Sequence, residues 1–217
     1  MAALYIEGKE FEYEEEQLSI YTSPEISYDE ARKILFCTQD VFSQNGLNVS
    51  LSFGTLLGAV RDKNFIKGDY DVDVFIKDEK LLLSSLWKIK QAGLNLIRAS
   101  AHRVYSFRLN SNSHCYIDVY ILKSTSTIWG LYCYELNGLM IPKKYLHEDK
   151  ISFLGRSFSC PANPENLLKF WYTETWNIPM GKFEKQYKYE VASHYYYNRI
   201  KLFFKRNLQK LLIWKSK

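Results

Sequence analysis

Three aspartates alternate with apolar or aromatic residues in the run DYDVDV at residues 69–74. Alternation with period two is typical of a β-strand, in which residues i, i+2 and i+4 share one face. The pattern predicts that the carboxylates of Asp69, Asp71 and Asp73 project together while the valines enter a core. Because like charges repel, we expect a cation between them, and carboxylate oxygens suit a hard divalent ion, Mg²⁺ or Mn²⁺.

An alternating acidic run has two other interpretations. A calcium loop of the EF-hand type also begins Asp-x-Asp-x-Asp, but it needs Gly at position six and Glu at position twelve. Val74 and Lys80 occupy those positions here, which excludes that site. A solvated acidic edge strand is the second interpretation, and it stays open because most runs of charge are only solvated faces.

The segment before the aspartates has the composition of a phosphate-binding turn. A strand expected over residues 48–53 leads into Gly54, Thr55 and a short helical turn. Glycine lets backbone amides approach a phosphate, threonine adds a hydroxyl group, and a helix N-terminus favours an anion. We therefore expect a phosphate site and a metal site to share one active site.

A fourth acidic residue, Asp118, lies in the otherwise apolar run YIDVYIL at residues 116–122. Burial of a lone carboxylate is costly unless the group is paired or bound to a metal. The functional interpretation makes Asp118 the third metal carboxylate, on a strand beside that of Asp71 and Asp73. The alternative is a structural aspartate satisfied by local hydrogen bonds.

Together these residues resemble the LicD/fukutin-related family of the nucleotidyltransferase superfamily. The resemblance rests on the runs GTLLGAVR at 54–61, Phe65-Ile66 and DYDVDV at 69–74, and a further element, YTETWNIP at 172–179, resembles the end of the family domain. It covers residues 50–179.

The resemblance implies transfer of a phospho-alcohol, most of all phosphocholine from CDP-choline, to a sugar hydroxyl of a surface glycan, with release of CMP. The acceptor would be a lipopolysaccharide, teichoic acid or capsule glycan or glycolipid, and ribitol or glycerol phosphate are alternative groups. The implied catalytic residues are Asp71, Asp73, Asp118 and Arg61, with Asp118 also able to take the acceptor's proton. The substrate-binding set is Gly54, Thr55, Gly58, Arg61 and Lys67, and the metal set is Asp69, Asp71, Asp73 and Asp118.

Two rival functions belong to other classes. A glycosyltransferase also uses Asp-x-Asp to hold a nucleotide sugar, but such enzymes place a larger nucleotide-binding half before that motif, and only 68 residues precede Asp69. A membrane-associated binding protein with a relic site is the second rival. Retention of Gly54, Thr55, Arg61 and all four acids argues against it.

The predicted fold is an α+β domain of the nucleotidyltransferase type, a mixed sheet backed by helices. Ser27 and Glu30 form a capping box that opens a helix ending at Asn45-Gly46. Other helices are expected over 80–91 and 166–172, and strands over 94–100, 103–109 and 114–122, with a hairpin at 153–158. We expect residues 1–26 to form an acidic arm or edge strand and residues 1–181 to form the catalytic domain.

Residues 182–217 form a second unit, with ten Lys and Arg against two Glu, in a chain whose net charge is +5. Apolar residues at helical spacing predict a basic amphipathic helix, which either docks on the core or contacts an anionic membrane. The excess of positive over negative charge lies entirely at this end of the chain, which argues against a nucleic-acid-binding surface spread over the whole domain. Four scattered cysteines, no membrane-spanning run and no leader pattern predict a cytoplasmic protein, peripheral at the inner face of the membrane.

Overall fold

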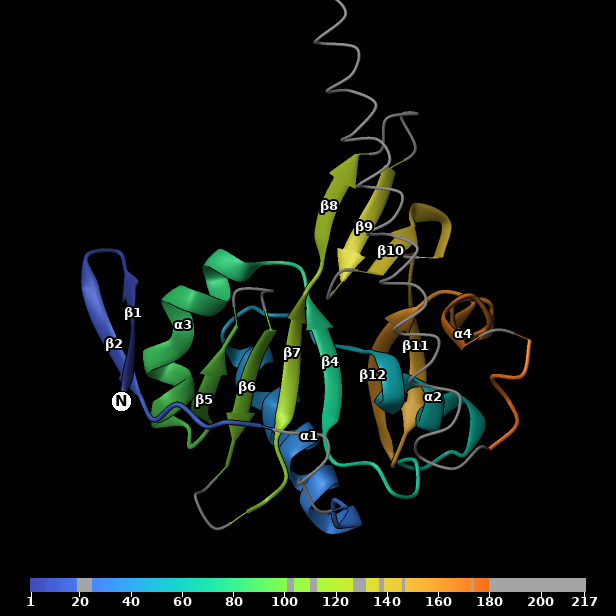
Figure 1. Ribbon diagram of the computed structural model, residues 1–217, viewed down its shortest axis with the longest axis horizontal. Coiled ribbons are helices and arrows are strands. Elements are labelled where there is room, and N and C mark those ends of the chain that lie inside the picture. The colour runs from blue at the N-terminus through green and yellow to red at the C-terminus, as the bar shows by residue number, and fades with distance from the viewer. Residues whose placement is uncertain are drawn as a thin grey trace, which may run out of the picture.

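The computed structural model describes residues 1–18, 25–100, 104–109, 113–126, 132–136, 139–145, 147–172 and 174–179. Its centre is a seven-stranded mixed sheet in the order β11-β12-β3-β4-β7-β6-β5 (Figure 1). The strands are β3 (Ser50–Leu51), β4 (Val72–Ile76), β5 (Asn95–Ala99), β6 (Val104–Arg108), β7 (Ile117–Ile121), β11 (Glu148–Phe153) and β12 (Arg156–Pro161). The basic helix expected over 182–217 lies outside the described residues.

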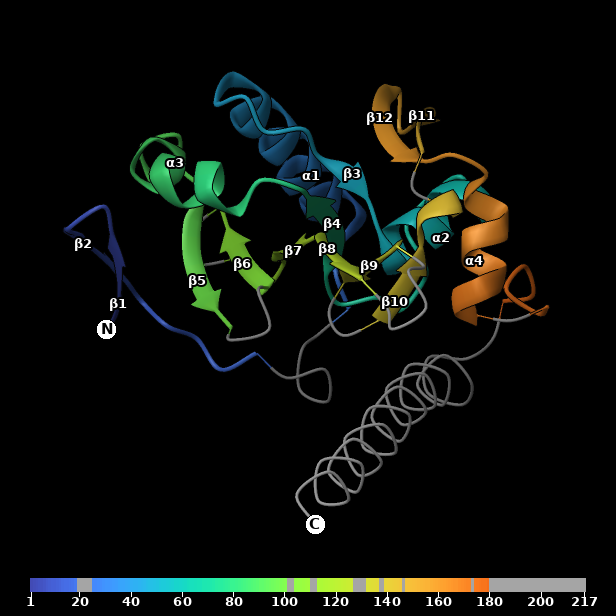
Figure 2. The same cartoon turned by 90° about the horizontal axis from the view of Figure 1, so that it is seen from above.

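Two long helices cover one face of this sheet. Helix α1 (Tyr28–Gln44) and helix α3 (Glu79–Gln91) lie on the same side of strands β4–β7 (Figure 2). The side chain of Ser27 accepts a hydrogen bond from the Glu30 amide at 3.2 Å, which confirms the predicted cap of α1. Phe42 of α1 packs edge-on against Phe107 of β6, so the side chains on Phe107's face of the sheet form the core.

Alternation along the strands places the chemistry on the opposite face. Phe107 pairs with Ile117, whereas its neighbour Ser106 pairs with Asp118. Successive side chains on a strand point to opposite faces. Ser106 and Asp118 therefore face away from α1, as does Asp73, which pairs with Asp118.

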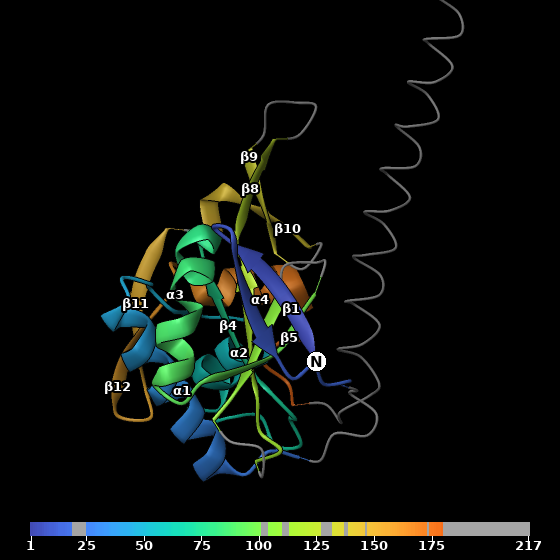
Figure 3. The same ribbon diagram turned by 90° about the vertical axis from the view of Figure 1, so that its left-hand side faces the viewer.

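Smaller elements surround the main sheet. The hairpin β1 (Ala2–Ile6) and β2 (Lys9–Tyr13) stands at one end, where Phe11 packs on Trp87 of α3 (Figure 3). A three-stranded sheet comprises β8 (Lys123–Ser126), β9 (Tyr132–Leu136) and β10 (Leu139–Pro142) and is followed by a 3-10 helix at Lys143–Tyr145. Helices α2 (Phe53–Arg61) and α4 (Pro164–Tyr172) contact each other beside β12.

The structure corrects one local prediction. The three aspartates do not share a strand, because β4 begins only at Val72 and Asp69 and Asp71 precede it in a loop. Pairing with β7 starts at Val72↔Ile117, and pairing with β3 reaches no further than Val74↔Leu51. Residues before Val72 therefore have no strand partner, and Gly68 with φ of +81° turns the chain there.

No helix among the described residues has both the length and the apolar character needed to span a bilayer.

Candidate functional site

Asp73 is held by the first turn of α2. Its Oδ2 accepts a hydrogen bond from the Gly54 amide at 3.0 Å, and its own amide donates to Thr55 Oγ1 at 2.8 Å. Helix α2 needs this partner because its N-cap residue, Ser52, makes no side-chain capping bond. Asp73 therefore caps the helix from a neighbouring strand, and the helix dipole favours its negative charge.

The backbone at the start of α2 is strained. Phe53 has φ of +34°, an uncommon conformation for a bulky residue. Its ring packs against Tyr120 and Trp171 at centroid distances of 4.9 Å, and this packing holds it in place. The Tyr120 hydroxyl in turn donates to Asp73 Oδ1 at 3.2 Å. Strain of this kind is concentrated at functional sites, where packing of the surroundings maintains it.

The loop before β4 brings a second carboxylate to the same place. A Cβ atom added at Gly54 would lie 2.8 Å from Asp69 Oδ2 and 3.2 Å from Asp73 Oδ2, so both oxygens converge on this glycine. Asp71 and Asp73 are only 7% and 6% exposed. Burial raises the pKa of Tyr70 strongly, and the nearby charges of Asp71 and Asp73 raise it further. The loop therefore concentrates negative charge at the start of α2.

The N-terminal arm braces this loop. The Ile26 amide donates to the Asp69 carbonyl at 2.9 Å, and the Gly68 amide donates to Glu25 Oε1 at 2.7 Å. These bonds hold the backbone on both sides of the turn at Gly68. Asp69 therefore has a defined position although it lies outside the strand.

Asp118 lies directly opposite Asp73 across the parallel pair β4–β7. It is 5% exposed, and burial raises the pKa of its carboxyl group, although Arg98 and hydrogen bonds from Ser106 and Tyr120 act in the opposite direction. Arg98 donates to both of its oxygens at 3.0 and 2.9 Å, and the Ser106 hydroxyl donates to Oδ1 at 2.5 Å. The strand of Asp118 lies beside that of Asp73, as the sequence predicted, and the Asp118 carboxylate is paired with Arg98 and Ser106.

The acids suit a hard cation by their chemistry. Converging carboxylate oxygens are the ligands that Mg²⁺ prefers, and a divalent ion would relieve the repulsion between Asp69 and Asp73. Among the described residues, however, no three acidic, histidine or cysteine side chains already stand in metal-binding geometry. Asp118 would have to leave Arg98 to join such a set, so its predicted role as a ligand stays a prediction.

The predicted substrate-binding residues do not all meet the acids. Both Nε and Nη2 of Arg61 donate to Asp62 at 2.7 Å, and Gly58 packs against the backbone of Asn64. Lys67 is exposed in the loop, and the Thr55 hydroxyl accepts from the Asp73 amide. Of this set, Gly54 and Thr55 contact one of the four predicted acids, and the substrate-binding role of every member stays a prediction.

Sequence reasoning missed three residues that contact the acids. Arg98, Ser106 and Tyr120 bind Asp118 or Asp73 directly. Each lies in a segment whose sequence predicts a β-strand, and no local motif distinguishes it as a functional residue. Their importance follows from the strand order, in which β7, β6 and β5 follow one another on one side of β4.

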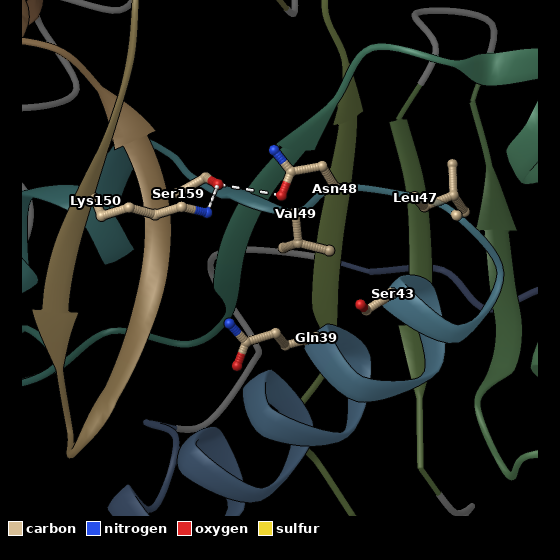
Figure 4. Close-up of a pocket in the computed structure, with 8 residues that line it drawn as sticks. Gln39, Ser43, Leu47, Asn48, Val49, Lys150 and Ser159 are labelled. Carbon is tan, nitrogen blue, oxygen red and sulfur yellow. Dashed lines mark hydrogen bonds between the residues drawn. The ribbon is translucent and has the colours of Figure 1, made fainter.

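A separate cavity of about 390 Å³ lies between the end of α1, the segment that leads into β3, and strands β11 and β12 (Figure 4). Lys150 Nζ donates to Ser159 Oγ at 2.7 Å, and Ser159 in turn donates to Asn48 Oδ1 at 3.1 Å. The other lining residues are Gln39, Ser43, Gly46, Leu47 and Val49. None of the predicted site residues lines this cavity.

Gly54→Ala tests the convergence of the two carboxylates. The new methyl group would occupy the space of Asp69 Oδ2, and Asp73 Oδ2 would also have to move. Misplacement of reacting groups by about 1 Å can cost on the order of a hundredfold in rate. We expect a rate loss of about tenfold or more, measured by steady-state kinetics. The melting temperature should change little, because the ends of flexible side chains give way, and a normal rate would refute the convergence.

A solved structure of the antibiotic-resistance factor ANT(2'')-Ia is similar, with a TM-score of 0.55, 11% identity, and coverage of 84% of this chain and 100% of that chain. Lincomycin-bound lincosamide antibiotic adenylyltransferase LnuA has a TM-score of 0.45 and 12% identity, over 66% of this chain and 85% of that chain. Identities this low concern the fold alone. No curated protein gives a significant match.

A family model described as LicD/FKTN/FKRP, nucleotidyltransferase domain, matches residues 46–163. The match includes α2, the acidic loop, β4 and β7, which are the elements that assemble the site. The predicted α+β fold of the nucleotidyltransferase type is confirmed by this match and by the mixed sheet with its helices. Because the model covers more than half of the chain, the protein belongs to the LicD/FKTN/FKRP family.

Proposed function

We propose that this protein transfers a phospho-alcohol from a CDP-alcohol to a sugar hydroxyl of a surface glycan, with phosphocholine from CDP-choline as the first candidate. Membership of the LicD/FKTN/FKRP family supports a transferase that modifies glycans. The observation that most supports it is the convergence of the Asp69 and Asp73 oxygens at the first turn of α2, with Asp118 opposite Asp73. Such a site suits a diphosphate together with a divalent ion.

In this proposal the acceptor oxygen attacks the phosphorus that bears choline. The bond from that phosphorus to the bridging oxygen breaks, and CMP leaves with that oxygen. Asp118 accepts the proton of the acceptor hydroxyl, which makes that oxygen a better nucleophile. Asp69, Asp71 and Asp73 would hold Mg²⁺ or Mn²⁺, which supplies charge stabilisation for the diphosphate and the leaving oxygen.

The first turn of α2 orients the site around the substrate. Gly54 leaves room for two carboxylates, and Thr55 ties the strand of Asp73 to the helix. The ring of Phe53 packs between Tyr120 and Trp171 beside this turn. These contacts preorganise the acids, so little reorganisation is needed when the donor arrives.

Incubation with a panel of donors tests the proposal. We expect CMP release from CDP-choline, CDP-ribitol or CDP-glycerol in the presence of Mg²⁺ and a glycan acceptor, and loss of release after chelation. The product should contain a phosphodiester, identified by mass spectrometry and ³¹P NMR. A glycoside formed from a nucleotide sugar would instead identify a glycosyltransferase, and no turnover with any donor would refute the proposed function.

A further inference from the structure

One polar side chain from each of four neighbouring strands forms a row on the acid-bearing face of the sheet. Asp73 of β4 pairs with Asp118 of β7, Asp118 pairs with Ser106 of β6, and Ser106 pairs with Arg98 of β5. These strands lie side by side in the sheet (Figure 1). Asp118 therefore stands between the negative charge of Asp73 and the positive charge of Arg98.

Arg98 reaches this row because β5 is irregular. Leu96 pairs with Phe107, but the next pair is Arg98 with Ser106, so Ile97 has no partner residue on β6. In a regular strand Arg98 would lie opposite Tyr105 and point to the helix-covered face, and Ile97 would occupy its place. Bulges of this kind are frequent beside active sites, where they redirect a side chain.

Arg98 contacts Asp118 and also Ser106, the residue that donates a hydrogen bond to Asp118. One terminal nitrogen binds both oxygens of Asp118, and Nε binds Ser106 Oγ at 3.0 Å. Ser106 is completely buried and donates its own proton to Asp118, which closes a three-membered network. The network holds the Asp118 carboxylate in one orientation and supplies its counter-charge.

We infer that Arg98 is a positioning residue that holds Asp118 apart from the metal-binding acids, so that Asp118 serves the acceptor hydroxyl and is not a metal ligand. The inference rests on the proposed function for the identity of the acceptor. It divides the four acids: Asp69, Asp71 and Asp73 would bind the cation, while Asp118 keeps its bonds to Arg98 and Ser106.

A double-mutant cycle tests whether Arg98 acts through Asp118. Arg98→Met should slow transfer about tenfold or more, and Asp118→Asn about a hundredfold or more, as expected for loss of a base. The double variant should be no slower than Asp118→Asn within about threefold, because residues that act as a unit are not additive. A further loss in the double variant would show that Arg98 contacts the substrate itself and would overturn the inference.

Metal affinity supplies a second readout that does not depend on turnover. In calorimetric titrations with Mg²⁺ alone, Asp118→Asn should change the dissociation constant by less than about threefold, whereas loss of a ligand should weaken binding by about tenfold or more. If the wild-type protein releases no CMP, the proposed function fails, but this titration still decides whether Asp118 is a ligand. Weakening beyond tenfold would overturn the inference.

Matched variants distinguish a positioning role of Arg98 from a contribution to folding. Arg156→Met removes an arginine that also binds a carboxylate, Asp40 at 2.7 Å, away from the row, and it should leave transfer unchanged. Arg98→Lys should recover part of the rate lost in Arg98→Met. Lysine restores the positive charge, but it cannot contact Asp118 and Ser106 through two separate nitrogens as arginine does. Should Arg98→Met fail to fold, Arg98→Lys and Ser106→Ala take its place in the cycle, and wild-type rates in both would refute the role of Arg98.

Discussion

Asp73→Asn should lower the rate of transfer about a thousandfold or more while leaving the protein folded. Asp73 forms hydrogen bonds with three other residues of the site, which are Gly54, Thr55 and Tyr120. Asparagine keeps the shape and a hydrogen-bond acceptor but removes the charge that a cation needs. Charge stabilisation by a bound metal supplies several kcal/mol, and each 1.36 kcal/mol is a factor of about ten in rate.

The stability of Asp73→Asn separates catalysis from structure. Loss of the carboxylate at the N-terminus of α2 costs about 0.3–1 kcal/mol, but it also relieves repulsion from Asp69 and Asp71. The melting temperature without Mg²⁺ should therefore equal or exceed that of the wild type, as measured by thermal unfolding.

Asp149→Asn is a suitable control for Asp73→Asn, because Asp149 is exposed on β11 and should not affect the rate. An Asp73→Asn variant that kept more than about a tenth of the wild-type rate would contradict the metal-binding role, since loss of a charged ligand removes most of the barrier lowering.

Gly58→Ala should destabilise the fold by about 1–2 kcal/mol. A Cβ at this position would lie 2.4 Å from the carbonyl oxygen of Asn64 and 3.2 Å from the amide nitrogen of Ile66. Both are backbone atoms, so the whole loop after α2 must shift, and overpacking of this kind typically costs about 1–3 kcal/mol. The higher helix propensity of alanine, worth about 1 kcal/mol, offsets part of this cost. Denaturant unfolding measures the difference.

The two glycines of α2 make a matched pair. In Gly54→Ala the clash is with movable side chains, and in Gly58→Ala it is with backbone. We therefore expect Gly54→Ala to lose mainly activity and Gly58→Ala to lose mainly stability. A Gly58→Ala protein as stable as the wild type would show that the loop after α2 moves easily, and it would contradict this prediction.

Local sequence patterns were sufficient to predict several helices and strands. The capping residue Ser27 and the stop at Asn45-Gly46 predicted α1 closely, and the helix expected over 80–91 begins one residue earlier, after an Asp78 cap. The period of the apolar residues also identified the strands that became β4 and β7. These features depend on contacts between residues close in sequence, which is why sequence reasoning found them.

The same reasoning failed for the acidic run, because alternation continues through Asp69 and Asp71 although no neighbouring strand is available to pair with them. Strand limits depend on partners that are distant in sequence. The sequence also assigned Arg61 as a cation for the substrate, whereas its neighbour Asp62 binds two of its three guanidinium nitrogens. That role stays a prediction.

The sequence by itself determined which residues could do chemistry, and it determined the α+β class, because residue type and periodicity are local properties. Only the tertiary structure decided which of these residues meet. Strand order placed Asp118 opposite Asp73, and one extra residue in β5 turned Arg98 onto the same face. Strand order and bulges arise from packing between distant segments, so no local pattern encodes the contact between Arg98 and Asp118.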